Sequence, residues 1–293
     1  MKVILYSHLA NPDDIPIIRE MIQSLQAASS EIFVYSEWMK KIAPVLPEIT
    51  AFKAIRTYRD LQKHRLDILF SLGGDGTILN AATFIRDSGL PILGINLGRL
   101  GFLATLDRNE VARIIPQLSQ GHYTVDARSL LGLECNKPIF KDTPFALNDF
   151  TLTKRDNSSM IKIRTFLDGA YLNTYWADGI IVATPTGSTG YSLSCGGPII
   201  LPESNTFVIT PVAPHTLTAR PIVVPDNVTL TFEVEGRTEN FLCTLDSRFE
   251  TITADHQVSI RKAPFDLNLI KLPTDNNLET IREKLNWGKD IRN

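Results

Sequence analysis

The sequence predicts an α/β domain followed by an all-β domain, with the last segment of the chain returning to the first domain. Up to about residue 121, short apolar runs alternate with segments whose apolar residues recur at helical spacing, which favours a parallel sheet flanked by helices. From Tyr123 onward, helical spacing disappears and strand-length segments follow one another, which is typical of a β-sandwich. We therefore expect an α/β domain over residues 1–121 plus 266–293 and a β-sandwich domain over residues 122–265.

Composition limits the classes of function that the chain can have. A length of 293 residues, 43% of them hydrophobic, is enough for two domains with sizeable cores. The net charge of -2 carries no basic excess, so we expect no nucleic-acid groove and no surface for anionic membranes. The three cysteines are widely separated and show no metal-type or redox-type pairing, so we expect reduced thiols. No apolar run reaches membrane-spanning length. The apolar amino terminus is too short for a signal peptide, so we expect a cytoplasmic protein.

The first domain is predicted to alternate strands and helices. Its strands are the apolar runs at residues 3–6, 31–35, 67–71 and 91–95. The first helix follows Asp13 and Asp14 and carries Ile18, Met21, Ile22 and Leu25 on one face. Further helices are predicted at residues 36–42, 56–65, 77–87 and 107–120.

The second domain is predicted to contain strands only. They lie at residues 160–167, 170–176, 180–183, 207–210, 228–234, 241–245, 250–253 and 258–262. Asp168-Gly169 between the first two is a strong signal for a two-residue hairpin. A strand at residues 267–272 and a helix face of Leu278, Ile281 and Leu285 should then pack back on the first domain.

A glycine-rich loop follows the buried strand at residues 67–71. Gly73, Gly74 and Gly76 can take positive φ and bring backbone N–H groups close to a ligand, while Thr77 can cap the next helix, as in a phosphate cradle. Asp75 would repel phosphate unless it acts as a general base for a hydroxyl or as a ligand to a phosphate-bound Mg²⁺. The alternative is an ordinary turn, since Asp and Gly are common turn formers.

Two more segments could bind a ligand. The loop at residues 96–103 follows the next strand, and adjacent strand ends in an open α/β sheet form a ligand crevice. The segment at residues 178–198 offers backbone N–H groups, hydroxyls and one aromatic ring, which suits a nucleotide; a long polar surface loop is the alternative. We expect His215 to be structural rather than catalytic.

These motifs occur in one order and at family-like spacing. Together they make the chain resemble the NAD kinases. The segments that carry the resemblance are residues 73–77, 96–103, Ala146-Leu147-Asn148-Asp149, 178–198 and 209–221. The resemblance implies a Rossmann-like α/β phosphate-binding domain and a β-sandwich nucleotide-binding domain. It also implies transfer of the ATP γ-phosphoryl group to the 2′-hydroxyl of the adenosine ribose of NAD, giving NADP. The implied enzyme is a phosphotransferase with an alcohol group as acceptor, commonly a homodimer or homotetramer, whose divalent metal, expected to be Mg²⁺, is carried mainly by the ATP phosphates.

The resemblance also assigns site residues. It implies that Asp75 is the general base. It implies that the substrate contacts are Gly74, Gly76, Thr77, Asn96, Phe102, Asn148, Asp149, Trp176, Asp178, Thr186, Thr189, Gly190, Tyr191, Ser192, Leu193, Ser194 and Arg248. Four of these positions depart from the family pattern: Asp149 replaces Glu, Gly190 replaces Ala, Trp176 stands where a basic residue is common, and Arg248 ends Asp-Ser-Arg in place of Asp-Gly-Gln.

Two other functions share some of these features. A diacylglycerol or sphingoid kinase would have the same glycine-aspartate loop, but the sequence shows no Lys-rich amphipathic helix that could dock on a bilayer. A non-catalytic NAD-binding sensor would keep the nucleotide loop, yet Asp75 would then only weaken the binding of anions. A test for NADP formed from ATP, Mg²⁺ and NAD separates the three hypotheses.

Overall fold

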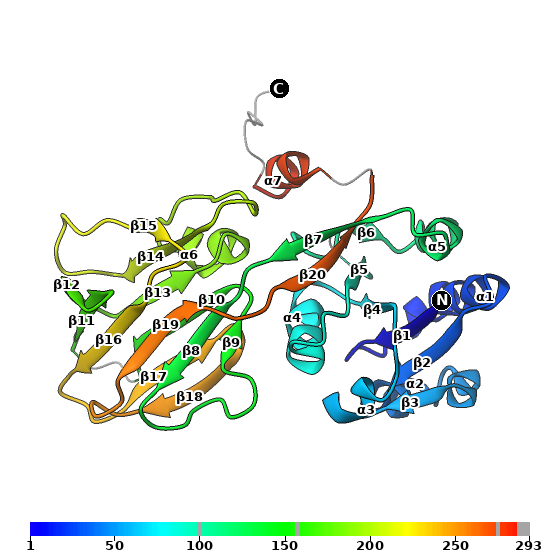
Figure 1. The fold of residues 1–293 in the computed structure, drawn as a ribbon, viewed down its shortest axis with the longest axis horizontal. Coiled ribbons are helices and arrows are strands. Elements are labelled where there is room, and N and C mark those ends of the chain that lie inside the picture. Colours follow the sequence, from blue (N-terminus) through cyan, green and yellow to red (C-terminus); the bar gives the residue numbers. More distant parts are fainter. Residues whose placement is uncertain (99–100, 156–158, 274–275, 286–293) are drawn as a thin grey trace. The chain divides into compact units, whose positions relative to one another are not determined.

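The computed structural model describes residues 1–98, 101–155, 159–273 and 276–285. Contacts within the chain divide it into two compact units, Met1–Ala127 with Asn268–Asn293, and Arg128–Leu267. We call them the α/β unit and the β unit. A parallel sheet in the first and antiparallel sheets in the second confirm the predicted fold class (Figure 1).

The α/β unit is built on one sheet with the strand order β3-β2-β1-β4-β5-β20-β7, and β6 also pairs with β5. The pairs β2–β3, β1–β2, β1–β4, β4–β5 and β5–β20 are all parallel. Its strands are β1 (Lys2–Tyr6), β2 (Glu31–Tyr35), β3 (Lys53–Ile55), β4 (Ile68–Leu72), β5 (Ile92–Asn96), β6 (Leu106–Asp107), β7 (Thr124–Arg128) and β20 (Leu267–Lys271).

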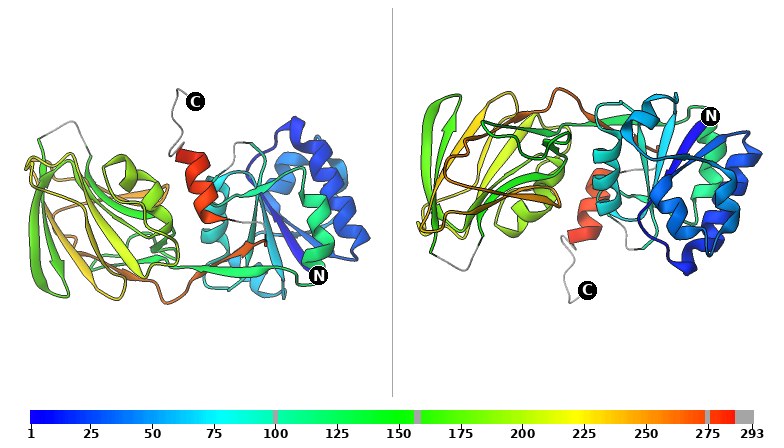
Figure 2. Two further views of the ribbon diagram at one scale, coloured as in Figure 1. Left: turned by 90° about the horizontal axis from the view of Figure 1, so that it is seen from above. Right: turned by 90° about the horizontal axis from the view of Figure 1, so that it is seen from below.

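Helices cover both faces of this sheet. They are α1 (Ile15–Ala27), α2 (Ser36–Ile42), α3 (Tyr58–Gln62), α4 (Asp75–Ile85) and α5 (Val111–Ser119), with short 3-10 turns η1 (Pro12–Asp14) and η2 (Pro47–Ala51). Helix α7 (Asn277–Leu285) follows β20; of its predicted face, Ile281 is buried, whereas Leu278 is 56% exposed. Figure 2 shows α1 and α5 side by side on one face and α4 on the other. The buried face of α5 is the predicted one, Val111, Ile114, Ile115 and Leu118, and it shares a core with Val3 and Leu5 of β1.

Three predictions about this unit are wrong in detail. The helix predicted at residues 56–65 is the short α3, and the unpredicted strand β3 precedes it. Helix α4 begins at Asp75 with Gly74 as its N-cap, so Thr77 lies inside the first turn and caps nothing. Asp107, the predicted start of the last helix, lies in β6, and α5 starts at Val111.

The β unit consists of two antiparallel sheets, with the strand orders β15-β14-β13-β10-β17-β18 and β12-β11-β16-β19-β8-β9. The first contains β10 (Asp149–Lys154), β13 (Gly179–Ala183), β14 (Thr206–Val212), β15 (Ile222–Pro225), β17 (Phe241–Leu245) and β18 (Arg248–Ile252). The second contains β8 (Leu131–Cys135), β9 (Phe145–Ala146), β11 (Ile161–Leu167), β12 (Ala170–Ala177), β16 (Leu230–Glu235) and β19 (Val258–Lys262).

One apolar core joins the two sheets into a sandwich. Phe150 of β10 and Phe232 of β16, from different sheets, are fully buried with ring centroids 5.4 Å apart. The predicted hairpin between β11 and β12 is confirmed, because both Asp168 and Gly169 have the positive φ of a type I′ turn. In the segment at residues 178–198, the predicted strand is β13, and the polar stretch after it contains the 3-10 turn η3 (Thr186–Thr189) and the short helix α6 (Tyr191–Ser194).

No helix among the described residues is long and apolar enough to cross a membrane.

Strand β7 pairs with β20 within the sheet of the α/β unit, although the sequence pattern changes to that of the second domain at Tyr123.

Candidate functional site

The glycine-rich loop of the α/β unit lies at the point where the strand order of its sheet reverses, between β1 and β4. β1 lies between β2 and β4, so the chain builds outward on both sides of it, and ligands of open α/β sheets bind at the carboxyl ends of strands beside such a point. Gly73 and Gly74 follow the end of β4, and the loop after Asn96 follows the end of β5. The two predicted loops are therefore neighbours in the sheet.

The amino end of α4 offers backbone donors to an anion. The N–H groups of Gly74, Asp75 and Gly76 have no acceptor among the described residues. Unpaired N–H groups at a helix amino terminus form a site for phosphate. Gly73 has a φ of 153°, and a side chain there would overlap the hydroxyl of Thr77, whereas Gly76 lies in ordinary helical backbone with open space around it.

Asp75 holds the second loop in place. Its Oδ2 accepts the N–H of Phe102 at 2.8 Å, and its Oδ1 accepts those of Leu103 and Ala104, both at 3.0 Å. Gly101 lies so close that a Cβ there would be 1.9 Å from Oδ1. A carboxylate has four lone-pair sites, so one site, on Oδ2, remains for a proton or a hydroxyl. The side chain of Asn96 is also used locally, since its Oδ1 accepts the N–H of Gly98.

The residues at this loop do not form a metal cage. No group of three or more His, Cys, Asp or Glu side chains that could hold a metal ion occurs in the part of the chain that the structure describes. Magnesium is commonly bound by one or two carboxylates together with substrate phosphates. The donor set of this chain therefore fits a metal that arrives on a nucleotide.

In the β unit, the predicted nucleotide segment is fixed tightly to the start of β10. The buried hydroxyl of Thr184 donates to the carbonyl oxygen of Leu147 at 2.6 Å. The backbone N–H of Thr184 donates to the carbonyl oxygen of Asn148 at 2.9 Å. A Cβ on Gly187 would lie 2.0 Å from the carbonyl oxygen of Asn148, so only glycine fits there. The hydroxyl of Ser192 is buried against Thr210 at 2.8 Å, so it supports the loop from within.

Asp149 is the most unusual group of the β unit. Its side chain is buried and has no hydrogen-bond or ion-pair partner among the described residues. Burial, together with the nearby carboxyl of Asp246, raises the pKa of Asp149 to about 7. The amide side chain of Asn148 likewise has no partner among the described residues. A buried polar group without a partner is costly, so Asp149, with the half-buried Asn148 beside it, is suited to receive hydroxyls from a ligand.

The other predicted residues of the β unit fall into two groups. Tyr191 is 44% exposed at the start of α6, and Asp178 forms an ion pair with Lys154 at 2.6 Å. Thr186 accepts a hydrogen bond from Arg128, while Thr189 bonds the carbonyl of Thr186. Leu193 is half-buried and Ser194 is exposed. Only some of these side chains are therefore available to a ligand.

Arg248 is directed into its own unit. Its guanidinium donates to the carbonyls of Thr143 and Phe145 and lies over the rings of Phe140 and Phe145. Burial lowers the pKa of Arg248, and the charge of Asp246 opposes that shift. Two of its donors are thus used within the fold.

Trp176 lies at the edge strand β12, beside a cavity of about 590 Å³. The ammonium of Lys162 lies 4.8 Å from the centre of its indole ring, and His215 and Arg237 also line the cavity. Trp176 thus has a positive charge beside it, supplied by the residue opposite it on β11.

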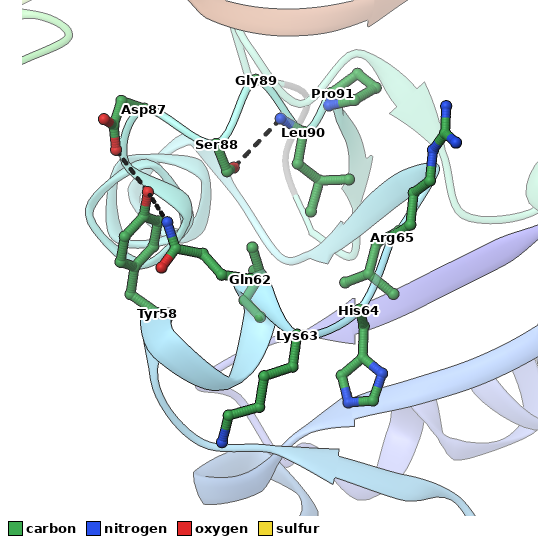
Figure 3. Close-up of a pocket in the computed structure, with 12 residues that line it drawn as sticks. Tyr58, Gln62, Lys63, His64, Arg65, Asp87, Ser88, Gly89, Leu90 and Pro91 are labelled. Carbon is green, nitrogen blue, oxygen red and sulfur yellow. Dashed lines mark hydrogen bonds between the residues drawn. The ribbon is translucent and has the colours of Figure 1, made fainter.

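A second cavity, of about 680 Å³, lies in the α/β unit (Figure 3). Residues 58–66 precede β4 and residues 87–91 precede β5, so this cavity lies at the amino ends of these strands. Figure 3 shows the hydroxyl of Tyr58 between Asp87 and Gln62, bonded at 2.7 and 2.9 Å. The cavity is therefore at the opposite edge of the sheet from Asp75.

Three residues with a place in this geometry were not predicted to be site residues. Gly101 abuts Asp75, Lys154 pairs with Asp178, and Asp246 accepts hydrogen bonds from the backbone beside Asn148. The contacts of Gly101 and Lys154 leave no local pattern in the sequence. Asp246 falls in the four residues between the strands predicted at 241–245 and 250–253, where Asp, a common turn former, could have indicated a turn.

Comparison with known proteins covers both units. Residues 7–123 match the model of the ATP-NAD kinase N-terminal domain, and residues 147–272 match that of the ATP-NAD kinase C-terminal domain. The chain is 45% identical to an NAD kinase of Cytophaga hutchinsonii over 284 residues, 96% of each chain, and 44% identical to one of Flavobacterium psychrophilum over the whole of both chains.

Solved structures share the fold. Yeast NADH kinase complexed with NADH has a TM-score of 0.86 at 24% identity, with 100% of this chain and 89% of that chain covered. An NAD kinase from Archaeoglobus fulgidus in complex with ATP has a TM-score of 0.71 at 22% identity, with 97% of each chain covered.

The close approach at Gly187 can be tested with a matched pair of alanine substitutions. Gly187→Ala should lower the melting temperature and the activity, because the new methyl group overlaps the backbone of Asn148. Gly190→Ala should have a much smaller effect, because its Cβ would meet the nearest atom, the carbonyl oxygen of Gly187, at 3.3 Å, which a shift of a few tenths of an ångström relieves. Thermal melts and initial rates of both variants check this, and equal effects would contradict it.

The raised pKa of Asp149 predicts a pH-dependent stability. Between its ordinary pKa of 3.8 and about 7, Asp149 keeps in the native state a proton that the unfolded state has lost, so its contribution to stability falls as pH rises through this range. Asp149→Asn should therefore gain in melting temperature relative to wild type from pH 4 to pH 8, by on the order of 10 °C. The offset at pH 4 gives the pH-independent cost of the substitution.

The exposed Glu239→Gln in the same unit provides the control for this measurement. It should follow the wild-type pH profile. A constant difference between Asp149→Asn and wild type across the range would show that Asp149 is not the titrating group.

Proposed function

The chain belongs to the NAD kinase family, and from this premise we propose which of its residues carry out the transfer of the ATP γ-phosphoryl group to the 2′-hydroxyl of the adenosine ribose of NAD. The family models and the full-length relatives give no support to a lipid kinase or to a non-catalytic sensor. The observation that carries the assignment is the combination at α4: unpaired N–H groups of Gly74 and Gly76 on either side of one carboxylate.

Asp75 is the general base in this proposal. A secondary alcohol is too weak an acid to ionise in the ground state, so a carboxylate accepts its proton as the new phosphorus–oxygen bond forms. The free lone pair on Oδ2 can take that proton while three amides keep the carboxylate fixed. Because general base catalysis contributes about 10²–10⁴-fold, alignment and charge must supply the rest of the acceleration.

The amino end of α4 binds the phosphates in this proposal. Its free N–H groups donate to phosphate oxygens, and the helix dipole adds to their attraction for negative charge. A divalent metal, which we propose is Mg²⁺, would be held mainly by the phosphates and would neutralise charge there. The loop 73–77 has no Lys, so the metal has a larger share of that neutralisation.

The β unit supplies the nucleoside contacts. The buried carboxyl of Asp149 and the free amide of Asn148 can bond ribose hydroxyls, and the half-exposed ring of Tyr191 can stack on a base. NADH in the yeast enzyme and ATP in the Archaeoglobus enzyme support NAD and ATP as the substrates of this chain.

Assembly and location extend the proposal. The resemblance implies a homodimer or homotetramer, and the short apolar amino terminus favours the cytoplasm. The three cysteines, Cys135, Cys195 and Cys243, are free, which fits a reducing compartment.

The direct test is an assay for NADP with ATP, NAD and Mg²⁺. We expect NADP to form, and chelation of the metal with EDTA to stop the reaction until Mg²⁺ is restored. Parallel reactions with diacylglycerol and with NAD lacking ATP serve as controls. Turnover of the lipid, or no NADP from the folded protein, would overturn the assignment.

Asp75→Asn should lower kcat by about 10²-fold or more, because the amide cannot accept the hydroxyl proton. The amide oxygen can still accept part of the N–H bonding from residues 102–104, so the KM for NAD should change by less than about 5-fold. Gly101→Ala, which keeps the carboxylate but crowds it, should lower kcat as well. Near-wild-type kcat in Asp75→Asn would remove Asp75 from the chemistry.

Tyr191→Ala should raise the KM for NAD by about 5- to 150-fold, the range that base–aromatic stacking gives, while kcat at saturating NAD changes much less. Tyr191→Phe keeps the ring and should stay near wild type. Steady-state kinetics with varied NAD decide the matter. An unchanged KM in Tyr191→Ala would place the nucleoside elsewhere.

A further inference from the structure

The turn between β17 and β18 makes an unusual contact with the start of β10. Leu245 and Arg248 are the last paired residues of the hairpin, so Asp246 and Ser247 form its loop, and Asp246 has a positive φ of 53°. The carboxylate of Asp246 accepts three consecutive backbone N–H groups, from Leu147 at 3.0 Å, Asn148 at 2.8 Å and Asp149 at 3.2 Å. Its own N–H donates to the carbonyl of Asp149 at 2.9 Å.

These bonds fix one short segment from both sides. Asp246 takes the N–H groups of residues 147–149, and Thr184 of the nucleotide segment bonds the carbonyls of Leu147 and Asn148. The side chains of Asn148 and Asp149, which have no partners among the described residues, project from this segment. Their positions therefore depend on a carboxylate that bonds only the backbone.

The surroundings of Asp246 act on its protonation in opposite directions. Burial raises the pKa of Asp246, while the three amides and Arg248 oppose the shift. Arg248 is itself anchored to the carbonyls of Thr143 and Phe145. The three amides and the anchored Arg248 therefore favour the carboxylate form of Asp246 in this buried position.

We propose that Asp246 is a positioning residue for nucleotide binding: it holds Asn148 and Asp149 where they bond the ribose of NAD, although it does not touch the substrate. This inference rests on the proposed function of Asn148 and Asp149. It assigns to the hairpin turn a part in substrate affinity, which neither the motif nor the fold assigns to it.

The test is a double-mutant cycle on NAD affinity. Asp246→Asn suits the positive φ, because Asn tolerates this region, but it replaces one acceptor oxygen with a donor. It should weaken NAD binding and raise the KM for NAD by about 10-fold or more, since each hydrogen bond to a charged group contributes on this scale. In the background of Asn148→Ala with Asp149→Ala, the same substitution should cost less than about 3-fold, because the side chains that it positions are already gone.

Asp168→Asn is the matched control. Asp168 also lies at positive φ in a two-residue hairpin of the β unit, and its carboxylate accepts the N–H of Thr229 at 2.8 Å. It has no bond to the segment 147–149, so the KM for NAD should stay at the wild-type value even if the melting temperature falls. A rise in KM equal to that of Asp246→Asn would show a general loss of folding and would overturn the proposal.

Equilibrium binding of NAD separates this inference from the proposed function. Equal costs of Asp246→Asn in both backgrounds, with NAD bound and NADP formed by wild type, would overturn the positioning role alone. Absence of NADP formation by wild type would instead overturn the proposed function. If Asp246→Asn does not fold, Asp246→Glu, which keeps the charge on an arm longer by one methylene, is measured in the same cycle, and additivity there counts equally against the proposal.

Discussion

One kind of interaction recurs at the two places to which we assign chemistry and nucleotide binding: an aspartate carboxylate that accepts three consecutive backbone N–H groups. Asp75 does this with residues 102–104 and Asp246 with residues 147–149, each across a long stretch of sequence. Hydrogen bonds to an ionised acceptor are roughly twice as strong as neutral ones, and three on one carboxylate fix a loop without regular secondary structure. Both loops can thereby be irregular in conformation, as ligand contact requires, and still be held in one position.

Local patterns in the sequence predicted those elements whose stability is local. The bounds of β2 and β17 matched the prediction because each is an apolar run with polar residues at both ends. β3 was missed because two of its three residues are exposed on an edge strand, which leaves no apolar signal. The start of α4 was misjudged because Thr77 is a good capping residue, whereas the chain uses Gly74, whose missing side chain leaves the N–H groups open.

The residue types of the candidate site could be predicted from the sequence, but their hydrogen bonds and ion pairs could not. Asp75 stands out because a carboxylate among glycines is unusual, and that much is local. Its bonds to a loop some 27–29 residues away, and the ion pair of Lys154 with Asp178, depend on strand order, which spacing does not reveal. The same limit explains why Asp149, left without a partner, could not be distinguished from Asp178, which has one.

The return of β20 to the first sheet has a consequence for the order of folding. β20 lies between β5 and β7, so the sheet of the α/β unit stays incomplete until the segment Leu267–Lys271 has been synthesised. Domains generally fold as units while the chain emerges from the ribosome. The β unit, Arg128–Leu267, emerges before that strand is complete, and it has all its own strands available while β7 still lacks its neighbour. The first domain in the sequence is therefore the second to be finished, and it remains exposed to misfolding and proteolysis for the longer part of synthesis.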